Sequence, residues 1–159
     1  MAYLGKYYFE TAIILRNSFL VGSILCSSET WYNVTEKEIR TVEQIDESFL
    51  RKLMETGKGC PLAMLYLTLG IQPLRFVVKS RRLNFLHYML NENEDSMLNK
   101  FLICQINQPS RGDWIHQTLK DLKEFEINIS LDELKNIPKN KFKQIVREKG
   151  EEKNHFCIY

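Results

Sequence analysis

The sequence LRFVVKSRRLNFLHYML, Leu74–Leu90, decides the fold of this chain. At 100° per residue its apolar side chains cover two opposite sides of a helix, and Arg75, Lys79 and Arg82 form a narrow row between them. Arg81 lies nearby, and the segment contains no acid. A helix that is apolar on two sides is typical of the interior of a helical assembly. The row of cations indicates an anionic neighbour, although arginine and lysine stems also cover apolar surface while their charged ends stay in water.

Turn and capping residues predict further helices on both sides of this segment. The sequences Thr35-x-x-Glu38 and Ser130-x-x-Glu133 are capping boxes, which mark helix starts. We expect helices at about residues 3–26 and 96–107, and helices that begin after Thr35, Pro61, Pro73, Gly112, Ser130 and Pro138. No stretch alternates at period two for long enough to demand a strand. The sequence therefore predicts an all-α fold, an irregular bundle of about seven to eight helices.

Charge is small in total and uneven along the chain. The formal net charge of +2 argues against a globally basic nucleic-acid binder. Residues 71–90 nevertheless hold four cations and no acid, and residues 135–149 hold six cations and one acid. In the second segment Lys139, Lys143 and Arg147 recur every four residues along one helix face. These three residues and the four cations of residues 71–90 are the candidates for binding nucleic acid: Arg75, Lys79, Arg81, Arg82, Lys139, Lys143 and Arg147.

The sequence contains no arrangement that predicts catalysis. Two-metal catalysis needs carboxylates that converge on the ions, whereas Asp46-Glu47, Glu94-Asp95 and Glu151-Glu152 are expected on a solvated helix face, in a loop and in a charged tail. The three histidines are scattered, and no glycine-rich loop follows a strand. We therefore expect no catalytic residue, no metal site and no cofactor.

Cysteine spacing and hydropathy bear on the compartment. The four cysteines are far apart and form no CxxC motif, which favours free thiols in a reducing compartment. The apolar run Ala12–Cys26 is too short to span a bilayer and is interrupted by Arg16. We expect an intracellular protein, nuclear or cytoplasmic, with no membrane partner.

Three blocks, read in order, resemble a known family. They are Tyr3–Tyr32 (YLGKYYFETAIILRNSFLVGSILCSSETWY), Ser80–Leu90 (SRRLNFLHYML) and Phe101–Leu122 (FLICQINQPSRGDWIHQTLKDL). Residues 45–70 also match in their apolar pattern and in their glycine and proline positions. The ordered set is similar to the region just downstream of the polymerase core in non-LTR (LINE-type) retrotransposon proteins, and the likeness covers residues 3–148.

The resemblance implies the helical thumb and linker that follow the palm of a reverse transcriptase, an RNA-directed DNA polymerase. The catalytic carboxylates of that family lie upstream, in a Tyr/Phe-x-Asp-Asp hairpin that this chain lacks. We expect a truncated, non-catalytic piece, with a thumb-like region at residues 3–107, a helical linker at 108–150 and a disordered tail at 151–159.

Two classes of partner remain open. A thumb presents cations to RNA, DNA or an RNA–DNA hybrid, and a continuous basic groove that joins the two basic segments would favour this role. A protein-interaction module, or an inert relic, would instead expose the surface that packs on the palm or self-associates, with Tyr3, Tyr7, Tyr8 and Phe9 as its exposed residues. Trp31, Tyr32 and Trp114 are expected in the core rather than as base-stacking residues.

Overall fold

The computed structural model describes residues 2–108, 110 and 112–156, and within them the side chains of residues 8–153. The elements are, in chain order, α1 (Ala2–Leu15), the π-helix η1 (Arg16–Val21), α2 (Gly22–Ile24), the 3-10 helix η2 (Ser28–Thr30), α3 (Glu36–Leu53), α4 (Leu62–Leu69), α5 (Leu74–Asn91), α6 (Met97–Asn107), α7 (Trp114–Glu124), α8 (Leu131–Lys135) and α9 (Lys139–Phe156). These described residues contain no strand, and eight of the α-helices have five or more residues. The predicted all-α fold is confirmed.

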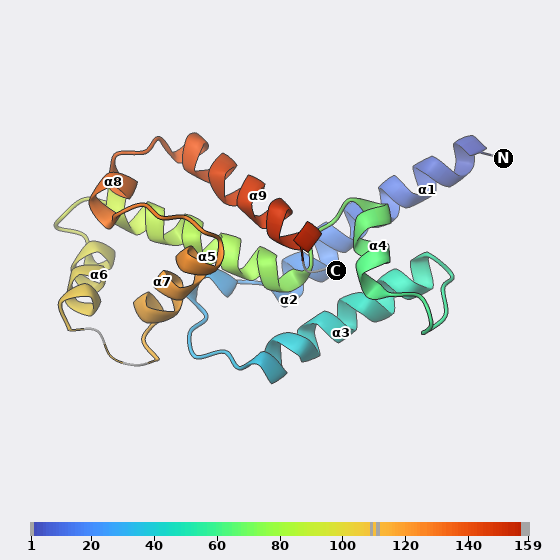
Figure 1. Cartoon of the computed structure of the whole chain (residues 1–159), viewed down its shortest axis with the longest axis horizontal. Helices are drawn as coiled ribbons and strands as arrows, with labels where there is room; N and C mark the ends of the chain where they lie inside the picture. The colour runs from blue at the N-terminus through green and yellow to red at the C-terminus, as the bar shows by residue number, and fades with distance from the viewer. Residues whose placement is uncertain (1, 109, 111, 157–159) are drawn as a thin grey trace.

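Helix α5 is the centre of the molecule: α9 runs alongside it, α6 and α8 lie at its C-terminal end, α7 packs beside it, and α1 to α4 lie toward its N-terminal end (Figure 1). The His87 ring of α5 stacks on Phe142 of α9 with centroids 4.9 Å apart, and its Nε2 lies 2.8 Å from the Ile137 carbonyl oxygen. At the other end of α9, Gly150 lies beside Phe125 and Gln72, so α9 runs antiparallel to α5.

One large core contains residues from both sides of the boundary predicted after residue 107. Its buried members come from α5 to α9 and the loop after α7: Phe76, Leu83, Leu86, Met89, Leu102, Trp114, Ile115, Leu122, Phe125, Ile127, Leu134, Phe142 and Val146. Two smaller clusters lie under α1 to α4. The two regions predicted at residues 3–107 and 108–150 therefore share a core, because both contribute side chains around the same central helix.

The predicted helix starts agree with the structure. In both capping boxes the N-cap hydroxyl accepts from the backbone N–H three residues on, and the glutamate accepts from the N-cap N–H. Hydrogen bonds from the backbone and side chain of Thr35 hold the pKa of Glu38 below its ordinary value of 4.5. Gly70 ends α4 in the left-handed conformation with φ 62°, which glycine adopts without a Cβ penalty.

The first predicted helix contains a break that the sequence analysis missed. Arg16 opens the π-helix η1 and is 3% exposed. Its Nε and Nη2 donate to the two carboxylate oxygens of Asp46 on α3, at 2.6 and 2.5 Å. Asp46 is completely buried, so its placement in a solvated acid pair was wrong. The amphipathic pattern of α3 gave no sign of this ion pair, because the partner comes from another helix.

The C-terminal segment also differs from the prediction. Residues 151–156 continue α9 and are not a disordered tail, and residues 157–159 lie outside the described part of the chain. Glu151 lies 3.7 Å from Arg147, and Glu152 lies 2.7 Å from Lys149, each one helical turn away. These ion pairs between residues one turn apart stabilise the helix at its C-terminal end, where the charged composition had suggested a solvated tail.

Two further predictions concern membranes and cysteines. In the described part of the chain, none of the helices taken alone has the length and apolar composition needed to span a membrane. Helices α4 and α5 taken together have that length and composition, but the chain bends by 59° between them. Cys26, Cys60 and Cys104 have free thiols. Cys157 lies outside the described residues.

Candidate interaction surfaces

The cations of α5 are engaged within the molecule. Arg75 donates from Nε and Nη2 to the two carboxylate oxygens of Glu43 on α3, at 2.8 and 2.6 Å. Lys79 pairs with Glu124 at the end of α7. Each of these cations therefore already has an acidic partner from a neighbouring helix, and nucleic-acid phosphate would have to compete with it.

The two arginines in the middle of α5 are also engaged within the molecule, and Arg82 is buried. Arg81 donates from Nη1 to the carbonyl oxygen of Leu25, with Ser28 Oγ at 3.4 Å. Arg82 is 3% exposed, and its Nη1 lies 3.0 Å from Oδ2 of the buried Asp121 on α7. Burial lowers the pKa of the Arg82 guanidinium and raises the pKa of the Asp121 carboxyl. Arg82 is therefore buried against α7 and not presented to a phosphate in solution, so its assignment to nucleic acid is withdrawn.

The cations of α9 are arranged differently. Lys139, Lys143 and Arg147 are all exposed, in a row along α9 that lies beside the core residues Phe142 and Val146. Arg147 lies 3.7 Å from Glu151. The partners found for the α5 cations lie on α3, on α7 and at Leu25 and Ser28, and among the described residues none of these partners is on α9.

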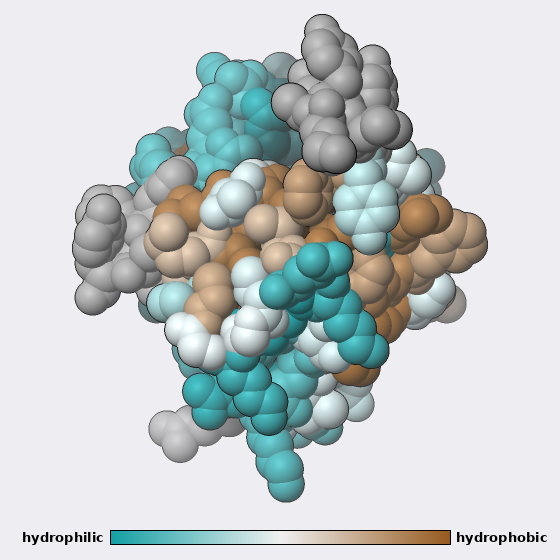
Figure 2. Space-filling model, turned by 90° about the vertical axis from the view of Figure 1, so that its right-hand side faces the viewer, coloured by the Kyte–Doolittle hydropathy of each residue, from teal (hydrophilic) through white to brown (hydrophobic). Residues whose placement is uncertain are grey.

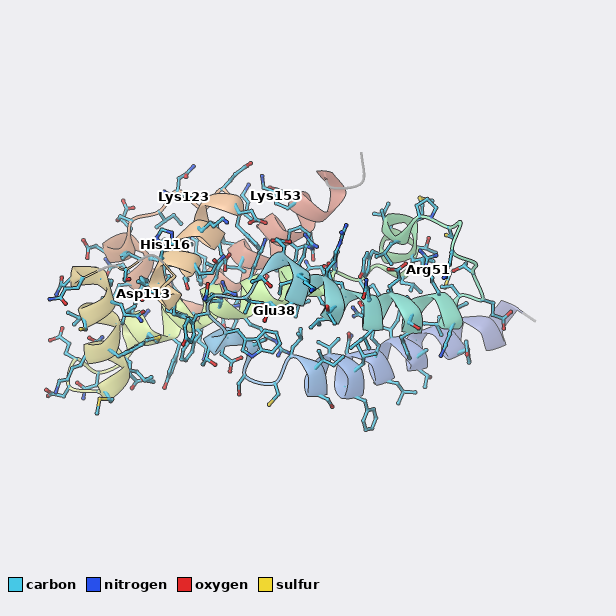
Figure 3. The ribbon with its side chains drawn as sticks, turned by 90° about the horizontal axis from the view of Figure 1, so that it is seen from below. Glu38, Arg51, Asp113, His116, Lys123 and Lys153 are labelled. Atoms are coloured by element: carbon cyan, nitrogen blue, oxygen red, sulfur yellow. The ribbon has the colours of Figure 1, made fainter. Side chains whose placement is uncertain are left out.

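Helix α7 adds exposed basic residues that sequence reasoning missed. His116, Lys120 and Lys123 are exposed and lie on one face of α7 at spacings of four and three residues. Figure 3 shows Lys123 at the same edge of the molecule as Lys153 of α9, with His116 further from that edge. Lys153 pairs with Glu126, so this edge carries charges of both signs. The amphipathic spacing of α7 was the signal that could have identified the three residues.

An apolar surface covers the outer side of α1 and η1. Ile14 is 62% and Phe19 is 69% exposed, and Leu15 lies between them with about half of its surface exposed. Figure 2 shows the adjoining end of the molecule, where hydrophobic side chains form a band across the face above a hydrophilic region. We call the exposed residues on this outer side the α1 surface: Tyr8, Thr11, Ile14, Leu15, Ser18, Phe19, Gly22 and Ser23.

The residues expected to be exposed at this end divide into two groups. Tyr8 and Phe9 are exposed, with 61% and 36% of their surface accessible, as predicted. Tyr3 and Tyr7 lie outside the described side chains.

A pocket with aromatic walls lies at the other end of the molecule, between η2, α5, α6 and α7. It has a volume of about 470 Å³ and is lined by four aromatic side chains, Tyr32, Phe85, Phe101 and Trp114, together with Asp113. Trp114 is 6% exposed, as expected of a core residue, but Tyr32 is 65% exposed and its expected core position was wrong. The aromatic residues come from three helices and from the loop after η2, so no local sequence pattern indicates the pocket.

The described residues contain no group of three metal-ligating side chains placed to hold an ion. Searches against family models, curated proteins and solved structures found no match to the chain.

Proposed function

We propose that this chain is a non-catalytic helical segment, similar to the thumb and linker of a non-LTR retrotransposon reverse transcriptase, that acts by packing its α1 surface against a partner protein. The observation that carries the proposal is the lack of exposed charge on that surface from Thr11 onward, after the exposed Glu10. Between residues 11 and 26 the one charged residue is Arg16, and its guanidinium is buried against Asp46.

The composition of the α1 surface supports protein packing. Single exposed apolar residues are normal, but a contiguous exposed apolar patch marks a site of interaction. Here Ile14, Leu15 and Phe19 adjoin Ser18 and Gly22, which are small enough to let another backbone approach. Such a helix face is well suited to packing on another helix or on a sheet.

The partner that this proposal favours is a reverse-transcriptase palm. In the family that the sequence resembles, this region directly follows the palm, and the first helix is the element nearest to it along the chain. A palm supplied as a separate polypeptide would cover the α1 surface and complete the hydrophobic contact.

The test is co-purification of the chain with a separately tagged palm region of a non-LTR retrotransposon. Ile14→Glu with Phe19→Glu places two charges on the α1 surface and leaves the core unchanged, because both side chains are exposed. We expect this double variant to lose the palm. Met97→Glu, on α6 and 82% exposed, is the matched control and should retain it. Equal recovery of the palm by the double variant would refute the proposal.

A second candidate function is sequence-independent binding of a nucleic-acid backbone by α9. The observation that favours it is the exposed row of Lys139, Lys143 and Arg147. Changing the row to alanine should weaken binding to a labelled RNA–DNA hybrid and reduce the slope of log affinity against log salt by about 3, since each phosphate contact contributes about 0.9. An unchanged slope would exclude α9, and Lys37→Ala on α3 is the control.

A further inference from the structure

The aromatic pocket between η2, α5, α6 and α7 lies away from both surfaces considered above. The Phe85 and Trp114 rings meet edge to face, with centroids 5.7 Å apart and planes at 85°. Trp114 is held in place by its indole N–H, which donates to the carbonyl oxygen of Glu29 at 2.8 Å. Phe101 and Tyr32, 50% and 65% exposed, stand at the open side of the pocket. The inner wall is therefore fixed by packing and the outer wall is open to solvent.

Asp113 supplies the charge of this pocket. Figure 3 shows Asp113 at the start of α7, close to α6. Its Oδ2 accepts the backbone N–H of Ser110 at 2.8 Å, and no lysine or arginine in the described part of the chain pairs with it. The pocket thus combines aromatic side chains with a carboxylate that has no cationic partner among those residues.

We propose that this pocket binds an arginine side chain presented by a partner protein. A cation over aromatic rings is attracted by the ring quadrupoles, and a guanidinium also stacks its planar surface on them. Its N–H groups match a carboxylate, which here is Asp113. An apolar side chain would fill the same volume but would take Asp113 out of water without a partner. A lysine would satisfy the charge but lacks the planar group that stacks.

The experiment follows the indole resonance of Trp114 in the ¹⁵N-labelled full chain. Trp31→Phe removes the only other indole, so one signal reports on the pocket. The probes are N-acetylarginine methylamide and N-acetylcitrulline methylamide, which have nearly the same shape and differ in charge. We expect saturable shifts with arginine and an affinity at least about tenfold higher than that for citrulline.

Asp113→Asn tests the carboxylate directly. The asparagine oxygen can still accept the Ser110 N–H, so the turn is kept while the charge is lost, and the preference for arginine should fall to within about threefold of citrulline. Asp132→Asn, an exposed charge at the start of α8, is the matched control and should change nothing. Phe101→Ala removes an exposed wall of the pocket and should weaken arginine binding even if Asp113→Asn perturbs α7. Equal binding of citrulline, no effect of either pocket variant, or no shift with arginine would overturn the proposal.

Discussion

Replacing Asp46 with asparagine should strongly destabilise the protein. Asp46 has no solvent-accessible surface, and it accepts two hydrogen bonds from Arg16, which is 3% exposed. The Tyr66 hydroxyl lies 3.4 Å from the same carboxylate. Asparagine keeps the size and one acceptor oxygen but removes the negative charge. Arg16 is then left as a buried cation without a counter-ion.

The expected magnitude follows from the burial of both partners. Breaking a buried ion pair on one side costs about 3–5 kcal/mol, because the remaining charge is desolvated and unpaired. For a chain of this length about 1 kcal/mol lowers the melting temperature by roughly 2–4 °C, so Asp46→Asn should lower it by roughly 6–20 °C. Most single domains have only about 5–15 kcal/mol of stability, so this loss is a large fraction of the total.

Urea unfolding followed by far-UV circular dichroism measures this loss. Adding Arg16→Met to Asp46→Asn removes the stranded cation and should restore at least half of the lost free energy, which a double-mutant cycle records as coupling. Asp132→Asn, an exposed acid on α8, is the control and should stay within about 0.5 kcal/mol of the native protein. A cost of Asp46→Asn below about 1 kcal/mol, or no rescue by Arg16→Met, would refute the reasoning.

Three further predictions concern other parts of the fold. Phe142→Ala removes a fully buried ring that stacks on the central helix, and should lower the free energy of unfolding by about 3–5 kcal/mol in urea titration. Hydrogen bonds in the two capping boxes depress the pKa of Glu38 and Glu133, so their stabilisation is present above the unfolded-state value of about 4.5 and is lost as pH falls through the lower folded-state values. The urea concentration at the unfolding midpoint of the native protein should decrease as the pH is lowered below about 4.5. A variant with both glutamates changed to glutamine should show a smaller decrease, and equal decreases would contradict the capping account. Arg51 donates to two carbonyl oxygens of the α3–α4 loop at 2.8 Å each (Figure 3), so Arg51→Met should speed proteolysis and amide exchange of that loop while the core amides exchange as before.

Local signals in the sequence predicted most of the secondary structure. The capping boxes at Thr35 and Ser130, the prolines at 61, 73 and 138 and the glycine at 70 each act within a few residues, so their effects can be seen in the sequence. The central position of α5 was also predictable, because a helix with apolar residues on two sides must be covered on both.

The candidate sites were harder to predict because charge pairing is not local. The Arg75, Lys79 and Arg82 row is real as a pattern on α5, but Glu43, Glu124 and Asp121 come from other helices and neutralise it. Separations of 32 to 45 residues between the partners leave no periodic trace in the sequence. The row on α9 has remained exposed, and its nucleic-acid role stays a prediction.

The sequence by itself determined that the chain is helical, where the main helices begin and that Leu74–Leu90 is central. These outcomes depend on capping, proline geometry and hydrophobic periodicity, which act over one or two helical turns. Only the tertiary structure decided that Asp46 is buried with Arg16 and that three cations of α5 pair with acids from other helices. It also decided that four aromatic residues distant in the sequence line one pocket. Those features require segments distant in the chain to pack side by side, and the desolvation that gives them their energy exists only after packing.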